Sequence, residues 1–154
     1  MFPLIGVGYF AIATVPLVFY DLRERRLPNK LTLPGLALAL VAIALSFDWS
    51  KFLVALGVGV LLFLAGTLLS MRGWIGMGDV KLVCGLAPLL SWFDPNLMWV
   101  AGMWSFGVAG AVVLVGYLMK KITARSTIAL GPYLLLGFWL AITPTIISKL
   151  NGAF

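Results

Sequence analysis

The chain has 154 residues and a formal net charge of +6 at pH 7; 62% of its residues are hydrophobic and 10% are charged. Average soluble chains are about 45–50% apolar and about 25% charged, so this composition excludes an ordinary soluble domain and indicates a protein surrounded mostly by lipid. The sequence has no histidine and one cysteine, Cys84, which excludes Ser-His-Asp and Cys-His nucleophiles, an intrachain disulfide and a cysteine zinc site.

Five uncharged stretches predict helices of spanning or near-spanning length. Twenty helical residues cover about 30 Å, roughly the thickness of the hydrocarbon core of a bilayer. In chain order the stretches are residues 1–20, 31–47, 52–71, 97–119 and 127–148. No linker, low-complexity segment or repeat separates them, so we expect a single membrane-embedded domain over residues 1–154.

The segment between the third and fifth of the six expected helices is less regular. Residues 82–93 are apolar, but they form a stretch of only 12 residues, too short to cross a bilayer alone. Adding residues 74–81 completes a span only if Asp79 lies at or inside the membrane boundary. We therefore predict an all-α polytopic membrane protein, a bundle of about six transmembrane helices with both termini on the same side.

The basic residues predict which side that is. Nine of the eleven Lys and Arg residues lie in the loops after the first, third and fifth expected helices, whereas Lys51 and Lys149 lie at the other end. By the positive-inside bias those three loops are cytoplasmic and both termini are non-cytoplasmic, so a cysteine placed at Ser126 should be labelled from the cytoplasm. The expected segments outside the membrane carry no basic stripe, so nucleic acid is not expected as a partner.

Asp21 and Asp79 are the two carboxylates with functional potential. Asp21 follows twenty uncharged residues, and Asp79 stands at membrane depth, where a carboxylate costs on the order of 2.5–3.5 kcal/mol and usually faces a polar cavity. If the first and fourth helices are neighbours, the two carboxylates meet at the cytoplasmic face. The alternative is two unrelated acids, one capping a helix and one paired with Lys81. The other acids have structural explanations: Asp48 and Asp94 are expected to precede or cap helices.

A close pair of carboxylates suits peptide hydrolysis. The pair shares one proton, because two adjacent negative charges are costly. The ionised member takes a proton from water, and the protonated member polarises the scissile carbonyl. This chemistry needs no histidine, cysteine, metal or cofactor, so none is expected. Gly76 and Gly78 lack side chains and would let a substrate backbone approach Asp79.

Three segments resemble the motifs of type IV prepilin peptidases. Residues 20–32, which run from Tyr-Asp through a basic stretch to Leu-Pro-Asn, resemble the first aspartate motif of that family. Residues 76–82 resemble its Gly-x-Gly-Asp motif, and residues 131–133 resemble its late Gly-Pro-aromatic element. The three segments occur in the family's order, on one predicted face, and together they extend over nearly the whole chain.

This resemblance implies an aspartic endopeptidase of the bacterial plasma (inner) membrane with Asp21 and Asp79 catalytic. Its substrates would be prepilins or pseudopilins, cut at the cytoplasmic face between a short basic leader and a hydrophobic helix, after a glycine. Pilus or type II secretion machinery would be a partner, beside the lipid bilayer itself. Many members add a cysteine-rich methyltransferase domain; this chain starts directly with a helix and has one cysteine, so methyltransferase activity is not expected.

Five further residues of these motifs are candidates for substrate binding or for shaping the site, and each also has a purely structural explanation. Lys81 would adjust Asp79 or contact a lipid phosphate, or it would only extend to the interface. Pro28 and Asn29 also fit a turn between two helices. Pro132 fits the first turn of a helix, and Gly131 beside it would line the cleft.

Three other functions stay open at this point. Signal-peptide-peptidase-like proteases share the Gly-x-Gly-Asp motif, but they usually have more helices and a Pro-Ala-Leu element, which does not occur in this chain. A small proton- or cation-coupled transporter would favour acids near the middle of the membrane and an internal repeat. A non-catalytic scaffold of a secretion machine would leave both aspartates dispensable.

Overall fold

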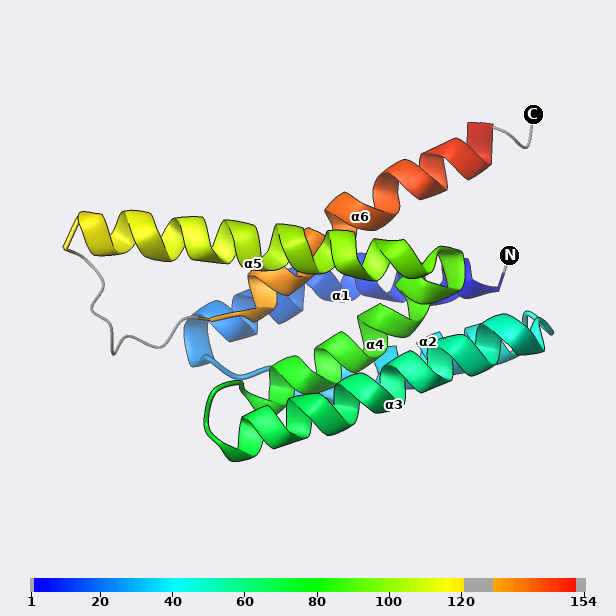
Figure 1. Cartoon of the computed structure of the whole chain (residues 1–154), viewed down its shortest axis with the longest axis horizontal. Coiled ribbons are helices and arrows are strands. Elements are labelled where there is room, and N and C mark those ends of the chain that lie inside the picture. Colours follow the sequence, from blue (N-terminus) through cyan, green and yellow to red (C-terminus); the bar gives the residue numbers. More distant parts are fainter. Residues whose placement is uncertain (1, 121–128, 152–154) are drawn as a thin grey trace.

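The structure is a computed structural model that describes residues 2–120 and 129–151. These residues form six helices and no strand (Figure 1). The predicted all-α fold with six helices is therefore confirmed for the described part of the chain. The helices are α1 (Pro3–Glu24), α2 (Asn29–Ala44), α3 (Trp49–Met71), α4 (Met77–Phe93), α5 (Pro95–Leu118) and α6 (Gly131–Asn151).

The six helices are not equivalent in length. By length and composition, α1, α3, α5 and α6 can each cross a membrane, whereas α2 has 16 residues and α4 has 17. The shorter α4 packs against each of the five other helices, and the residues along most of its length are buried. Because α4 is surrounded by protein rather than by lipid, it does not need the long apolar stretch that a lipid-facing helix requires. This position explains why its sequence pattern is the weakest.

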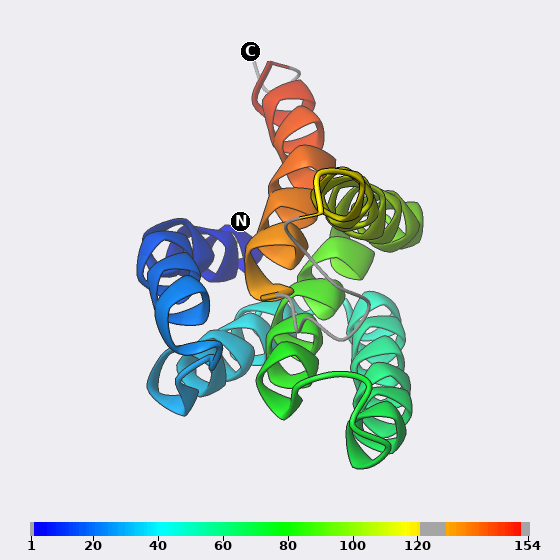
Figure 2. The same cartoon turned by 90° about the vertical axis from the view of Figure 1, so that its left-hand side faces the viewer.

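Successive helices run in opposite directions, which sorts the chain ends and loops into two groups (Figure 1). Both termini and the α2–α3 and α4–α5 turns lie at one end, which we call the outer end. The C-terminal end of α1 and the N-terminal ends of α2, α4 and α6 lie at the other, which faces the viewer in Figure 2. The latter, the basic end, carries seven of the nine described cations; Lys121, Arg125 and Ser126 lie outside the described residues.

The boundaries of α1 and α2 differ slightly from the predicted ones. Helix α1 continues to Glu24, so Asp21 lies inside its last turn rather than after its end. It stops at Arg25, whose φ of 52° is left-handed and whose N–H donates to the Asp21 carbonyl over 2.9 Å. Pro28 is extended (φ −68°, ψ 129°) and directly precedes α2. Pro28 therefore lies in the connection between the two helices and Asn29 begins α2, which agrees with the structural alternative for this pair.

Local caps close the helices at the outer end. The Asp48 side chain accepts a hydrogen bond from the backbone N–H of Lys51 over 3.1 Å at the start of α3. The Asp94 side chain accepts from the backbone N–H of Asn96 over 2.8 Å at the start of α5, where Pro95 is the first helical residue. The predicted structural roles of the two aspartates are therefore confirmed.

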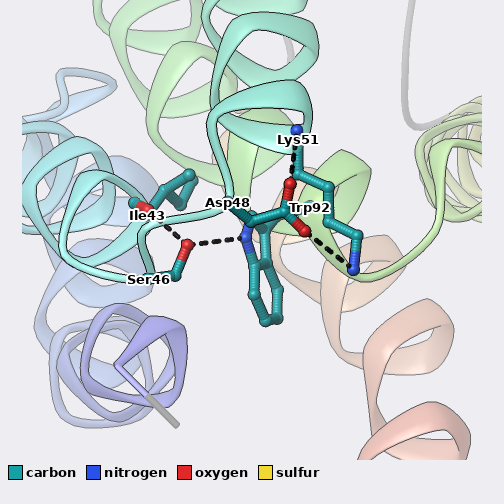
Figure 3. Close-up of polar contacts among 5 residues, drawn as sticks. All are labelled: Ile43, Ser46, Asp48, Lys51 and Trp92. Atoms are coloured by element: carbon teal, nitrogen blue, oxygen red, sulfur yellow. Dashed lines mark hydrogen bonds and ion pairs between the residues drawn. The ribbon is translucent and has the colours of Figure 1, made fainter.

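Side-chain contacts add to this closure of the outer end (Figure 3). The Trp92 indole N–H donates to Ser46 Oγ over 3.2 Å, and Ser46 Oγ donates to the Ile43 carbonyl over 2.6 Å. Lys51 Nζ lies 3.5 Å from Asp48 Oδ2 and 5.1 Å from the centre of the Trp92 ring. These contacts fasten the end of α2, the start of α3 and the end of α4 to one another.

Candidate active site

The carboxylate of Asp21 is buried at the basic end and is tied to the start of α6. Asp21 is only 4% exposed, and its Oδ2 accepts a hydrogen bond from the backbone N–H of Gly131 over 2.9 Å. Gly131 is the first residue of α6, and the residue before it, Leu130, has no side-chain acceptor. Asp21 therefore supplies from α1 the oxygen that a capping residue would normally provide, at the positive end of the α6 dipole.

The Gly131–Pro132 pair fits this contact closely. A Cβ on Gly131 would lie 2.7 Å from Asp21 Oδ2 and 3.3 Å from Leu27 Cδ2, so no larger residue can occupy this position without a shift. Pro132 lies in the first turn of α6, where its fixed φ suits a helix and its missing N–H is not needed. The Gly131 N–H is therefore bonded to Asp21, and Pro132, which has no backbone N–H, adds no competing donor beside it.

Asp79 occupies a similar position at the start of α4. It is the third helical residue after Gly76, which precedes the helix, and it is half-buried. The Asp79 carboxylate accepts a hydrogen bond from the backbone N–H of Gly76, and its Oδ2 lies 3.0 Å from the place that a Cβ on Gly76 would take. A third residue that bonds back to the N-cap amide is half of a capping box. Both carboxylates thus lie against helix N-termini, that of α6 for Asp21 and that of α4 for Asp79, and such ends favour negative charge.

The two aspartates are brought to the same end by neighbouring helices. Helices α1 and α4 are in contact, which is the condition on which the predicted meeting of the two carboxylates depends. Among the described residues no group of three or more His, Cys, Asp and Glu side chains is placed to hold a metal ion.

Leu27 contacts the first turn of α4, which carries Asp79, and the first turn of α6, which bonds to Asp21; no motif or pattern had singled it out. Its Cβ lies 3.0 Å from the Cβ position of Gly78, and its Cδ2 lies 3.3 Å from that of Gly131. The missing side chain of Gly78 therefore faces Leu27, so Gly78 allows close packing of the α4 start. One signal in the sequence is available in hindsight: Leu27 is an apolar residue within a short polar loop, and only burial explains it.

Lys81 and Asn29 join the second motif to the first. Lys81 Nζ donates a hydrogen bond to Asn29 Oδ1 over 2.9 Å, between the second turn of α4 and the start of α2. None of the roles expected for Lys81 from the sequence included this contact. With the bond between Asp21 and Gly131 and the packing of Leu27 on Gly78, it brings all three motif segments together at the basic end.

These features define a helical membrane protein with a carboxylate-bearing site at one end of the bundle. Residues 8–115 match the model of the type IV leader peptidase family. The chain therefore belongs to the type IV leader peptidase family, a family of proteases, and the resemblance drawn from its motifs is confirmed. The matched residues include both aspartate segments and end before Gly131. No curated protein and no solved structure matches the chain.

Proposed function

We propose that the chain is an aspartic prepilin peptidase in which Asp21 and Asp79 form the catalytic pair. The observation that carries this proposal is the convergence of three distant motif segments around these two side chains. Gly131 bonds to Asp21, Leu27 packs against Gly78 directly before Asp79, and α1 contacts α4. Family membership supports the reaction class and the prepilin-type substrate. A transporter or a scaffold would not require either the pairing or the family match.

The pair works by sharing one proton. The ionised carboxylate accepts a proton from water while the water oxygen bonds to the carbonyl carbon of the scissile peptide. The protonated carboxyl group donates its hydrogen bond to the carbonyl oxygen, and a proton then passes to the leaving amine as the C–N bond breaks. The remaining negative charge is favoured by the N-terminal ends of α4 and α6, which both meet the site.

The substrate enters from the basic end, which we assign to the cytoplasm by its excess of cations. The proposed substrates are prepilins and pseudopilins of a bacterial inner membrane, cut between a basic leader and an apolar helix. Their apolar helix lies in the bilayer, so the scissile bond is presented at the membrane boundary, where Asp21 and Asp79 stand. Gly76 is exposed beside Asp79 and leaves room for the substrate backbone there. Pilus or secretion machinery would take up the products.

The test is co-expression with candidate prepilins, with the new N-terminus of each product read by mass spectrometry. Asp21→Asn and Asp79→Asn should each abolish processing while the protein still inserts in the membrane. Asp48→Asn is the matched control, because it also removes a carboxylate but lies at the outer end and keeps an N-cap acceptor. Processing at the parental rate by either of the first two variants would refute the proposed pair.

A further inference from the structure

The loop between α1 and α2 contributes a single side chain to the protein core. Leu27 is 7% exposed and belongs to the main cluster of buried apolar residues. Its neighbours Arg25 and Arg26 are exposed. A loop residue that is buried in this way holds the loop against the helices that it contacts. Leu27 contacts the first turn of α4, which carries Asp79, and the first turn of α6, whose Gly131 N–H bonds to Asp21.

On one side Leu27 packs against the start of α4. The Cβ position of Gly78 lies 3.0 Å from Leu27 Cβ, 3.3 Å from its backbone nitrogen and 3.5 Å from its carbonyl oxygen. Gly78 is the residue directly before Asp79. The first turn of α4 therefore rests on both the side chain and the backbone of Leu27, and it cannot move closer to α1 without displacing them.

On the other side Leu27 packs against the start of α6. Its Cδ2 lies 3.3 Å from the Cβ position of Gly131, the residue whose N–H holds Asp21 Oδ2. The hydrogen bond between Lys81 and Asn29 joins α4 to the first residue of α2, directly after the same loop. The packing of Leu27 against Gly78 and the bond between Lys81 and Asn29 together fix the distance between the start of α4 and the α1–α2 connection, because a close-packed interior does not deform continuously.

We propose that Leu27 is a positioning residue, a spacer that sets the separation between the carboxylates of Asp21 and Asp79. The inference rests on the proposed function, since the spacing matters for catalysis only if the two aspartates act as a pair. Two carboxylates share a proton only while they are close, and the strength of their coupling depends on their separation. Leu27 itself touches neither water nor substrate in this role.

The first experiment compares Leu27→Ala with Leu89→Ala. Leu89 is equally a core residue at 0% exposed, but it packs against Gly6 toward the outer end, so its loss removes similar packing far from the pair. Leu27→Ala should lower kcat at least about tenfold with KM within about twofold, because a misplacement of 1 Å can cost about a hundredfold in rate. The pH–rate profile should also change in width, since the gap between the two ionisations of the pair depends on the strength of their coupling.

Leu89→Ala should keep the kcat of the inserted protein and the width of the parental pH profile. If Leu27→Ala does not accumulate in membranes, Leu27→Val decides the question with the same measurements, because it removes only one methylene group. A parental kcat and pH profile in the Leu27 variant that inserts would overturn the spacer.

A second experiment measures the spacing without any activity. Spin labels are attached to cysteines placed at Leu22 and Met77, two exposed residues that flank the aspartates, in a Cys84→Ala background. The distance distribution should shift or broaden in Leu27→Ala and stay parental in Leu89→Ala. An unchanged distribution in Leu27→Ala overturns the spacer even if the chain cuts prepilins. A shifted distribution supports the spacer even if no prepilin is cut, in which case it is the proposed function that fails.

Discussion

Asp21 at the basic end is hydrogen-bonded in a different way from the two aspartates of the outer end. At the outer end, Asp48 and Asp94 each bond to a backbone N–H two or three residues further along the chain. At the basic end, Asp21 bonds to Gly131, which is 110 residues away, and Lys81 bonds to Asn29, which is 52 residues away. Local contacts stabilise one helix at a time, whereas distant contacts hold several helices in one geometry. That difference distinguishes the carboxylate of Asp21, which joins α1 to α6, from the carboxylates of Asp48 and Asp94, which each cap one helix.

The two ends also differ in how their positive charges are balanced. At the outer end, Lys51 is paired with Asp48, and Lys149 Nζ lies 4.9 Å from the centre of the Phe93 ring. At the basic end the seven described cations outnumber the acids, and one of those acids, Asp21, is buried. The excess positive charge at this end suits the anionic headgroups of a cytoplasmic leaflet.

Labelling from the two sides of the membrane tests this assignment most directly, because the expected result is all-or-none. In a Cys84→Ala background, Ser50→Cys at the outer end should react with an impermeant maleimide in intact cells. Ser126→Cys, which falls outside the described residues, should react only after the cells are permeabilised. The reverse pattern would place the basic end outside the cell, where it would not meet a cytoplasmic leader.

Gly131→Ala should cause the largest loss of activity among substitutions that leave the carboxylates in place. The added Cβ would lie 2.7 Å from Asp21 Oδ2, and pushing that oxygen away should lower kcat about a hundredfold for a displacement near 1 Å. Gly8→Ala is the matched control near the N-terminus of α1, since nothing lies within 4 Å of its Cβ position. Prepilin cleavage by inserted protein measures both variants, and equal rates would show that Asp21 does not need the Gly131 contact.

Much of the fold was predictable because hydropathy and charge act locally. Apolar stretches gave the six helices, and their alternating directions placed Asp21 and Asp79 at the same end. Helix ends were less accurate: charge at Asp21 predicts where the lipid ends, but the helix continues to Glu24 because backbone hydrogen bonding does not stop at a charged residue. The central position of α4 was not predictable, since a short helix of this composition gives no sign of which neighbours surround it.

The sequence proposes residues for the candidate site but not the contacts between them. Asp21 and Asp79 were selected by their position at the ends of apolar stretches, and Gly131 by the motif resemblance. The packing of Leu27 against two glycines and the bond between Asn29 and Lys81 depend on how distant segments pack. No periodicity or spacing in the sequence encodes which glycine a loop leucine will contact, so these contacts required the structure.

Removing the bond between Lys81 and Asn29 at the basic end should lower kcat less than Gly131→Ala does, but more than removing an ion pair at the outer end does. Lys81→Met and Asn29→Ala should each lower kcat about three- to tenfold, since one hydrogen bond to a charged group contributes up to about 1.5–3 kcal/mol and less when it is exposed. The double variant should be no worse than either single variant, because both remove the same bond.

Lys51→Met is the control at the outer end, where loss of an exposed ion pair should leave cleavage within about twofold. Steady-state cleavage of one prepilin by these four variants and by the parental protein provides the comparison. Additive losses would mean that the two residues do not act through a shared bond. A loss in Lys81→Met with parental activity in Asn29→Ala would show instead that Lys81 acts on Asp79 or on lipid directly. The basic end would then depend on the charge of this lysine rather than on a contact that positions α4.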